Sequence, residues 1–318
     1  MARTAKSFQG YLKIVKDIEI ENPFFRGQSN RANKKNDCFT LKPSLGRYSF
    51  LKNKTMGDLS EYEEDVLEVF KNHVRGHNVL EAKNPWEYLA LAQHHGLPTR
   101  FMDWTTNPLV ALYFATRNTS YDDDGKPVDS AVYVLISNPK SLTAVEKELK
   151  KQKDKEKEDQ NKRNVVDLTQ ESILGVKQEE DPYAAYGLGE ATATVAIEND
   201  DEYSERQKNA EKLDETTYTS PLYLSENIVY YPPHISPRIR AQDGVLLACF
   251  NPLSEIEEKD YIEIIIKAES HKEIRQQLNK CGIYDKQLFP DVDGLTKWLK
   301  YNKFEVVQDE HEHSKEGS

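Results

Sequence analysis

Apolar residues recur at helical spacing in six segments of this chain. Within residues 8–18 and 59–74 they stand three or four positions apart, which places them on one face of a helix that packs against other elements. Pro85 and Pro108 suit the first turn of a helix, and Gly96 ends the helix that Pro85 begins. The predicted helices are residues 8–18, 59–74, 85–95, 108–116, 270–283 and 291–303.

Short runs of β-branched and aromatic residues predict strands between these helices. FFRGQ at residues 24–28 reads as a buried strand that presents Arg26 near its end, and SAVYVLIS at 130–137 is apolar enough for a central strand. Two further runs, GVLLACF at 244–250 and YIEIIIK at 261–267, have the same character. Because strands and helices do not alternate regularly, the predicted fold class is α+β, a mixed sheet flanked by helices.

The composition changes between residues 140 and 221. EKELKKQKDKEKEDQNKR is followed there by an acidic stretch with few large apolar residues, which predicts a long charged insert that is partly disordered. The insert divides one domain into residues 1–139 and 222–304, and residues 305–318 form an acidic, disordered tail. Such an insert serves as a lid, as an arm that binds a partner, or as a tolerated surface insertion.

Charge and cysteine content narrow the classes of function. The net charge of −11 argues against a general affinity for duplex nucleic acid, although a local basic groove is compatible with it. The three cysteines lie far apart and form no CxxC pair, so neither a disulfide framework nor a thiolate zinc site is expected. Neither a signal peptide nor a membrane span is recognisable, and the expected location is therefore the cytoplasm.

The first candidate for chemistry is Arg26. In FFRGQ two aromatic residues stand directly before a cation, and the amide of Gln28 follows. This places a group that binds phosphate or carboxylate in two-pronged fashion at the rim of the core. The alternative is an arginine that pairs with a buried acid or with backbone carbonyls.

The densest group of candidates lies in QHHGLPTRFMDW, across a helix end and a loop that contains proline. Adjacent histidines on a helix point about 100° apart, so one of His94 and His95 would face a cleft while the other caps the helix C-terminus. Arg100 and Asp103 either pair with each other or contact a ligand. Trp104 either offers a stacking face to a flat ring or belongs to the core.

A third group stands just before a predicted strand, in SPRIRAQDG. Arg238 and Arg240 are two arginines within three residues, which suggests anion binding, and Gln242 follows them. A solvated helix turn is the alternative. The chain has no Walker-type P-loop, no HExxH motif and no tight cluster of acids and histidines with the spacing that a hard cation needs, so no metal is expected.

Five segments have recognisable sequences and follow one another in a recognisable order: FFRGQ, LKPSLGR, QHHGLPTRFMDWTTNPLVALYFA, PRIRAQDG and LFPDVDGLTKWLK. The series resembles the FRG domain, which is named for a Phe-Arg-Gly signature, over residues 7–137 and 222–301. FRG domains are found in bacteria and phages and have lacked an assigned activity. The resemblance therefore implies a family before it implies a reaction.

The order of the segments is also similar to that of ADP-ribosyltransferases, and an ADP-ribosyltransferase-like fold is implied. That family has an Arg or His ending a first strand, then a strand before an Ala- and Phe-bearing helix, then a strand with a catalytic Glu. Arg26 would grip the diphosphate of NAD. The third position departs from the pattern, because Gln242 and Asp243 stand where the glutamate is wanted. Glu263 or Asp103 would have to steady the oxocarbenium-like ribose instead.

The leading hypothesis is an ADP-ribosyltransferase-like domain that binds NAD or a related nucleotide and modifies a protein or nucleic-acid acceptor in toxin or phage-defence conflict. The alternative is a non-catalytic sensor of a nucleotide, a nucleic acid or a phage protein. The implied cofactor-binding residues are Arg26, Gln28, Arg100, Trp104, Arg238, Arg240 and Gln242. The implied catalytic residues are Asp103, His94, His95 and Glu263.

Overall fold

The computed structural model places two compact units, Met1–Leu142 with Ser220–Ser318, and Thr143–Thr219. In the second unit residues 143–156 are helical, and the disorder predicted for the rest of the insert and for the tail lies outside the described residues. The first unit holds the sheet and every predicted site residue. The structure describes residues 2–31, 39–75, 82–156, 220–233 and 237–305.

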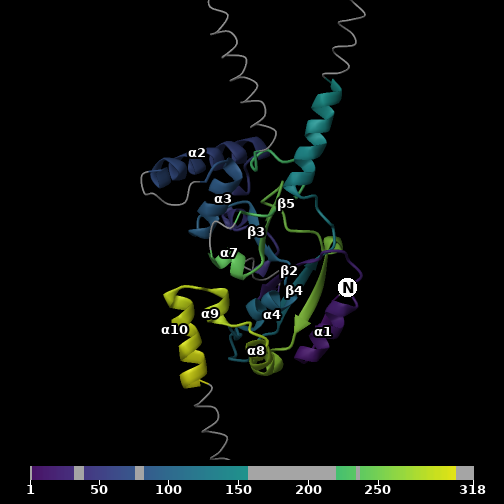
Figure 1. Cartoon of the computed structure of the whole chain (residues 1–318), viewed down its shortest axis with the longest axis vertical. Helices are drawn as coiled ribbons and strands as arrows, with labels where there is room; N and C mark the ends of the chain where they lie inside the picture. The colour runs from purple at the N-terminus through teal and green to yellow at the C-terminus, as the bar shows by residue number, and fades with distance from the viewer. Residues whose placement is uncertain (1, 32–38, 76–81, 157–219, 234–236, 306–318) are drawn as a thin grey trace, which may run out of the picture. The chain divides into compact units, whose positions relative to one another are not determined.

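One mixed sheet of seven strands organises the first unit (Figure 1). Across the sheet the order is β1-β7-β4-β2-β3-β6-β5; β1 and β7 are parallel, and all other neighbours are antiparallel. The predicted α+β class is confirmed. The strands are β1 Arg3–Ala5, β2 Phe24–Gln28, β3 Phe101–Thr105, β4 Ser130–Leu135, β5 Ile228–Tyr230, β6 Gly244–Ala248 and β7 Tyr261–Ile266.

Helices pack against this sheet, and each of the six predicted helical segments overlaps one of them. Asn84 and Asn107 cap the helices that begin with proline, since their side chains accept hydrogen bonds from first-turn amides. The part of QHHGLPTRFMDW that was predicted to be a loop contains strand β3 instead. The helices are α1 Phe8–Lys16, α2 Met56–Arg75, α3 Pro85–His94, α4 Pro108–Thr116, α7 Pro237–Ala241, α8 His271–Lys280, α9 Asp285–Leu288 and α10 Val292–Lys300.

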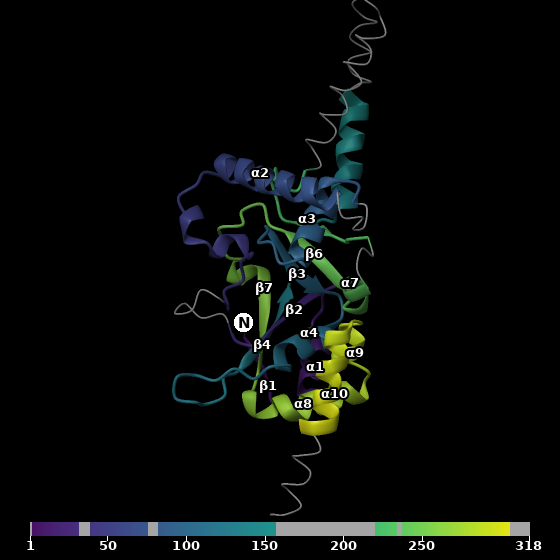
Figure 2. The same cartoon turned by 90° about the vertical axis from the view of Figure 1, so that its left-hand side faces the viewer.

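Alternating side chains of the strands divide the core into two layers. Phe25, Val132 and Ile264 pack with α1, α4 and α8 in the first cluster. Their chain neighbours Phe24 and Tyr133 belong to the second cluster, on the other face of the sheet. Figure 2 shows α3, α7 and α9 along one side of the sheet.

The ladder of the sheet is interrupted between β2 and β3. β2 pairs with β4 from Phe24↔Leu135 to Gln28↔Ala131, but in the described strands it pairs with β3 only at Phe25↔Thr105. On its other edge β3 pairs with β6 along its whole length. β2 and β3 therefore separate beyond Phe25, and this opening sets the position of the candidate site.

The chain segments on either side of residues 142–219 are joined at the edge of the sheet. Ser141 forms a parallel bridge with Val229 of β5, and the Val229 amide donates a hydrogen bond to the Lys140 carbonyl at 2.9 Å. The entry to the insert and the strand that follows its exit are thus fastened to each other.

Gly27 allows α4 to pack directly on β2. A Cβ at this position would overlap the carbonyl oxygen of Ala111, one turn into α4, and would press on the amide of Ala115. The backbone of β2 and the backbone of α4 are therefore in contact without a side chain between them. This contact holds one wall of the opening between β2 and β3.

We expect Gly27→Ala to lower the free energy of unfolding by about 1–3 kcal/mol, because the added methyl group forces β2 and α4 apart. The matched control is Gly57→Ala in α2, where the new Cβ meets its nearest neighbour at an ordinary 3.8 Å. The control should be neutral or stabilising, because alanine favours a helix over glycine. Urea denaturation measures both, and equal losses would contradict the close packing.

Candidate functional site

The guanidinium of Arg26 occupies the opening between β2 and β3. Its Nη1 donates a hydrogen bond to the carbonyl oxygen of Asp103 at 2.6 Å. The Arg100 carbonyl and the Thr106 amide form hydrogen bonds on the side of β6. Backbone groups of successive strand residues point to alternate sides, and both residues are an odd number of positions from Asp103, so the Asp103 carbonyl points toward β2. In a continuous ladder a backbone amide of the neighbouring strand would donate to the Asp103 carbonyl. Here the side chain of Arg26 donates in its place.

Burial leaves part of Arg26 without a partner. Its Nε is enclosed and makes no hydrogen bond to any described residue. Desolvation lowers the pKa of Arg26 and the charge of Asp103 opposes this effect, but a guanidinium keeps its proton at neutral pH. A buried donor without a partner costs about 1–3 kcal/mol, which an anionic ligand would recover.

A short relay of hydrogen bonds orients the carboxylate of Asp103. Gln93 on α3 donates its Nε2 to Oδ1 of Asp103 at 2.7 Å. The Oε1 of Gln93 accepts from the hydroxyl of Thr99, and that hydroxyl accepts from the Phe101 amide at 3.1 Å. Gln93, itself fixed by Thr99 in the loop before β3, therefore holds the Asp103 carboxylate in place, while the Asp103 side chain stays exposed.

Arg26, Gln93 and Asp103 line a pocket of about 310 Å³, a volume at the low end of ligand sites. Its walls come from β2, β3 and β6 of the sheet and from α3, α4 and α7 above it. The charged and polar side chains in its lining are Arg26, Gln93, His94, Asp103, Thr105, Arg238 and Gln242. Three segments that are far apart in the sequence therefore meet at one cavity.

The two histidines take different positions, as the sequence predicts for neighbours on a helix. His94 lines the pocket, whereas His95 is the C-cap residue of α3. Their rings are 5.2 Å apart and nearly perpendicular. Desolvation lowers the pKa of His94, as do the charges of His95 and Arg238, while Asp103 acts in the opposite sense. His94 is therefore mostly neutral at pH 7.

Arg238 brings a second cation to the pocket from the short helix α7. Its guanidinium lies over the ring of Phe289 at 4.5 Å, and that of Arg117 lies 4.9 Å from the same ring. Phe289 was not among the predicted site residues. The signal that could have found it is its place in the LFPDVDG segment of the motif series.

The other polar residues of these segments differ in their access to the pocket. Gln242 lines it, and its amide donates to the Leu288 carbonyl at 3.0 Å. Arg240 is exposed and is not part of the lining. Gln28 is buried, lies outside the lining, and has an Oε1 without a partner among the described residues.

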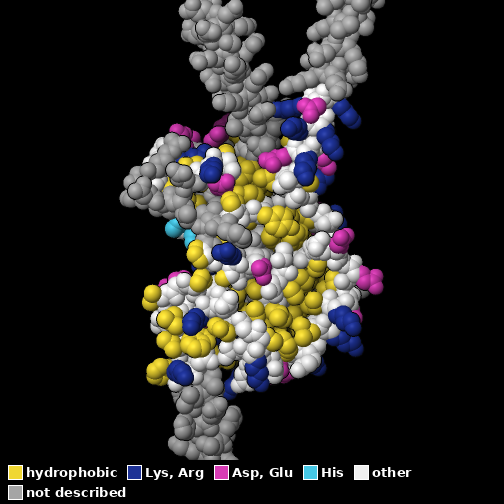
Figure 3. Space-filling model, in the orientation of Figure 1, with side chains coloured by type: hydrophobic (Ala, Val, Ile, Leu, Met, Phe, Trp, Pro, Cys, Tyr) yellow, Lys and Arg dark blue, Asp and Glu magenta, His cyan; other side chains and the backbone are white. Residues whose placement is uncertain are grey.

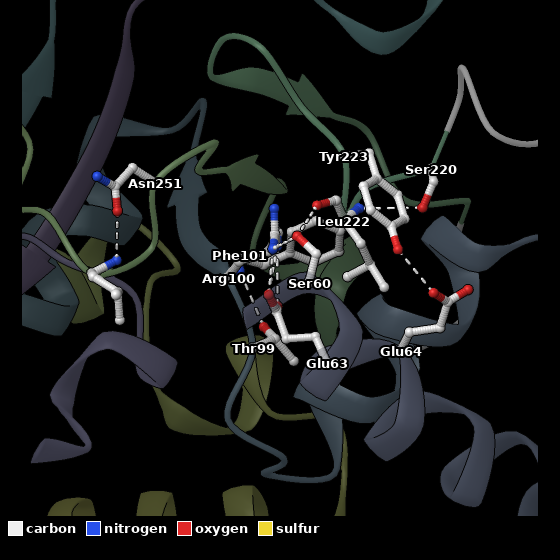
Figure 4. Close-up of polar contacts among 11 residues, drawn as sticks. Ser60, Glu63, Glu64, Thr99, Arg100, Phe101, Ser220, Leu222, Tyr223 and Asn251 are labelled. Carbon is white, nitrogen blue, oxygen red and sulfur yellow. Dashed lines mark hydrogen bonds and ion pairs between the residues drawn. The ribbon is translucent and has the colours of Figure 1, made fainter. Parts of the chain in front are cut away.

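Arg100 lies in a buried ion pair away from the pocket. Its Nε contacts the two carboxylate oxygens of Glu63 at 3.0 and 3.1 Å, and its guanidinium also reaches Ser60 (Figure 4). The predicted pairing with Asp103 is wrong, because an odd separation along an extended strand puts the two side chains on opposite faces. The predicted contact to a cofactor is not available to this guanidinium, which is only 2% exposed.

Of two further predicted residues, Trp104 forms part of the cavity wall but is buried, and Glu263 lies apart from the cavity. The ring of Trp104 belongs to the second core cluster, as the core interpretation has it, and its Nε1 is buried without a partner among the described residues. Glu263 on β7 forms a two-pronged ion pair with Arg31, with both N–O distances at 2.9 Å. Glu263 is absent from the pocket lining, where Asp103 is the carboxylate.

The comparisons with known proteins identify part of this chain. The family model for the FRG domain matches residues 21–124, so the chain contains an FRG domain. The matched segment runs from before β2 to beyond α4 and includes Arg26, His94 and Asp103. No curated protein and no solved structure matches the chain.

Two kinds of feature are absent from the described residues. They contain no helix with the length and apolar character needed to cross a membrane. Within the same residues, His, Cys, Asp and Glu side chains do not gather in groups of three that could hold a metal ion.

We expect Arg100→Met to destabilise the fold by about 3–5 kcal/mol, because it leaves the buried carboxylate of Glu63 without its partner. The control is Lys259→Met, which breaks the exposed ion pair with Glu257 and should change the stability very little, because water screens the two charges. Urea denaturation compares the two variants. An Arg100→Met protein as stable as the control would show that the buried pair adds nothing to stability.

Proposed function

We propose that the pocket binds NAD or a related nucleotide through its phosphates, and that the domain acts as an ADP-ribosyltransferase-like effector in bacterial or phage conflict. The observation that carries this proposal is the guanidinium of Arg26, enclosed between β2 and β3 with an unpartnered Nε. Arg238 supplies a second positive charge at the same cavity. Two cations at one pocket suit a diphosphate.

In this proposal Asp103 carries the chemistry at the ribose. Nicotinamide departs with the electron pair of the C–N glycosidic bond, and positive charge develops on the ribose ring. A fixed carboxylate stabilises that charge before an acceptor nucleophile bonds to the ribose carbon and loses its proton. Asp103 suits this role because Gln93 holds it in place and it is the carboxylate in the lining.

A second function, a sensor without turnover, is favoured by a specific observation at β6. Asp243 precedes this strand, where the transferase pattern has its glutamate, and its carboxylate is bonded to Asn107 at 3.1 Å. Asp243 is absent from the lining of the pocket. A domain that binds the nucleotide but does not cleave it would have this arrangement.

We expect Arg26→Gln to weaken NAD binding by about 10- to 100-fold, the equivalent of losing one charge-assisted contact of about 1.5–3 kcal/mol. Arg240→Gln is the matched control, because Arg240 is an arginine of the neighbouring segment outside the lining. Its effect should be less than about two-fold. Isothermal titration calorimetry measures all three proteins. Equal affinities for the wild type and the two variants would remove Arg26 from the site.

Asp103→Asn separates the two functions, since asparagine can still accept from Gln93 and the backbone carbonyl that holds Arg26 is unchanged. For a transferase we expect NAD binding to persist and nicotinamide release to fall by about 100-fold or more. Release is measured by chromatography in the presence of cell lysate. If the wild type binds NAD and releases no nicotinamide, the sensor function replaces the transferase.

The affinity for NAD should rise as the pH falls below about 6.5, the ordinary pKa of histidine. The pKa of His94 is lowered, so its imidazole is neutral above this range and gains a positive charge beside the phosphates only below it. Calorimetry from pH 5 to pH 8 tests this. His94→Gln should flatten the dependence, and His95→Gln, which alters the capping neighbour, should keep it.

A further inference from the structure

A second cavity, of about 230 Å³, lies apart from the pocket that contains Arg26. Its walls come from α2, from α3, from the loop before β3 and from the segment that contains two short 3-10 helices, η2 Leu45–Arg47 and η3 Ser49–Leu51. Among the described residues, the linings of the two cavities have no member in common. A ligand in one cavity therefore does not occupy the other.

The interior of the second cavity is apolar. Leu51, Leu67 and Leu89 are buried and reach it from three different segments of the chain. Within the described part of the lining Glu63 is the charged residue, and its carboxylate is already paired with Arg100. The cavity therefore offers no free charge to a ligand, and a charged group that entered it would lose its hydration without compensation.

Three aromatic side chains of the lining reach the surface. Tyr48, Phe50 and Tyr62 are 45%, 60% and 36% exposed. The ring of Phe50 stands edge to face with both others, at centroid distances of 6.1 Å from Tyr48 and 6.0 Å from Tyr62. The ammonium of Lys54 lies over the Tyr62 ring at 5.6 Å and helps to hold it. Such a group of rings attracts a further ring in edge-to-face or offset geometry.

The surface around this cavity favours a small molecule over a protein partner. Asp58, Glu61 and Asp65 of α2 are exposed next to Tyr62, and Figure 3 shows acidic and basic side chains over this helix. Within the described lining, the exposed apolar side chains are the three rings. A stable protein interface uses about 20–30 residues on each side, so three rings and a hollow suit a free ligand instead.

We propose that this second cavity binds an uncharged aromatic ligand, a ring system of about the size of indole. A cavity of about 150 Å³ lined by leucine, isoleucine and phenylalanine is large enough to bind benzene. The volume of about 230 Å³ therefore leaves room for two fused rings. One edge of the ligand packs on the buried leucines, and the other lies among Tyr48, Phe50 and Tyr62.

Indole is the probe for this site, and an NMR titration of the full chain measures its dissociation constant. We expect a value on the order of 1 mM or lower, as suits so small a ligand. Hexanol, an aliphatic alcohol, is the comparison. It should bind several-fold more weakly, because it gains no contacts between rings and loses freedom of rotation on binding.

Two substitutions locate the site. Val66→Phe places a ring inside the cavity and should weaken indole binding by about ten-fold or more. The matched control is Val69→Phe, the same change on the same helix at a residue that is exposed and outside the lining, and it should leave the affinity unchanged. Phe50→Ser removes an exposed ring of the opening and should weaken binding by about three- to ten-fold.

Circular dichroism checks that all three variants are folded. If Val66→Phe does not fold, the exposed position of Phe50 lets Phe50→Ser decide alone. A wild-type chain that binds no indole at concentrations up to about 5 mM would overturn the proposal. It also fails if the folded cavity variants bind indole as tightly as the wild type. Equal affinities for hexanol and indole would contradict the aromatic class of the ligand.

Discussion

The hydrogen bond from Arg26 to the Asp103 carbonyl is the interaction on which the pocket depends. A closed ladder between β2 and β3 would gain about 0.5–1.5 kcal/mol for each hydrogen bond and would leave no cavity. The guanidinium instead keeps the strands apart, while β4 and β6 hold their outer edges. The side chain of Arg26 therefore both separates the strands and places a positive charge between them. A substitution of Arg26 alters the pocket wall and the contact to a ligand together.

The two cations of the pocket are supported in different ways. Arg26 is fixed by a carbonyl of the sheet, and Gly27 beside it lets α4 close the wall. Arg238 stands on a helix of five residues and rests on the ring of Phe289. The position of the first cation therefore depends on the sheet, whereas the position of the second depends on the contact between α7 and α9.

Local patterns predicted much of the fold. Apolar spacing and the prolines at 85 and 108 located the helices, and residue type pointed to Arg26, to one of His94 and His95, and to Asp103 among other candidates. Pairings between distant segments could not be predicted in this way. The partner of Arg100 is Glu63, 37 residues earlier, and β1 pairs with β7 from the other end of the domain. Such contacts depend on how elements meet, which periodicity does not encode.

The bridge between Ser141 and Val229 separates the architecture of the domain from the length of the segment between them. This bridge lies at the edge strand β5. The pairing of the two segments is therefore fixed by residues that come just before residue 142 and by residues that follow the insert. Doubling a flexible connection adds only about 0.6 kcal/mol of closure entropy. Related chains can therefore lengthen, shorten or exchange this stretch while the cavity at the sheet centre keeps its shape.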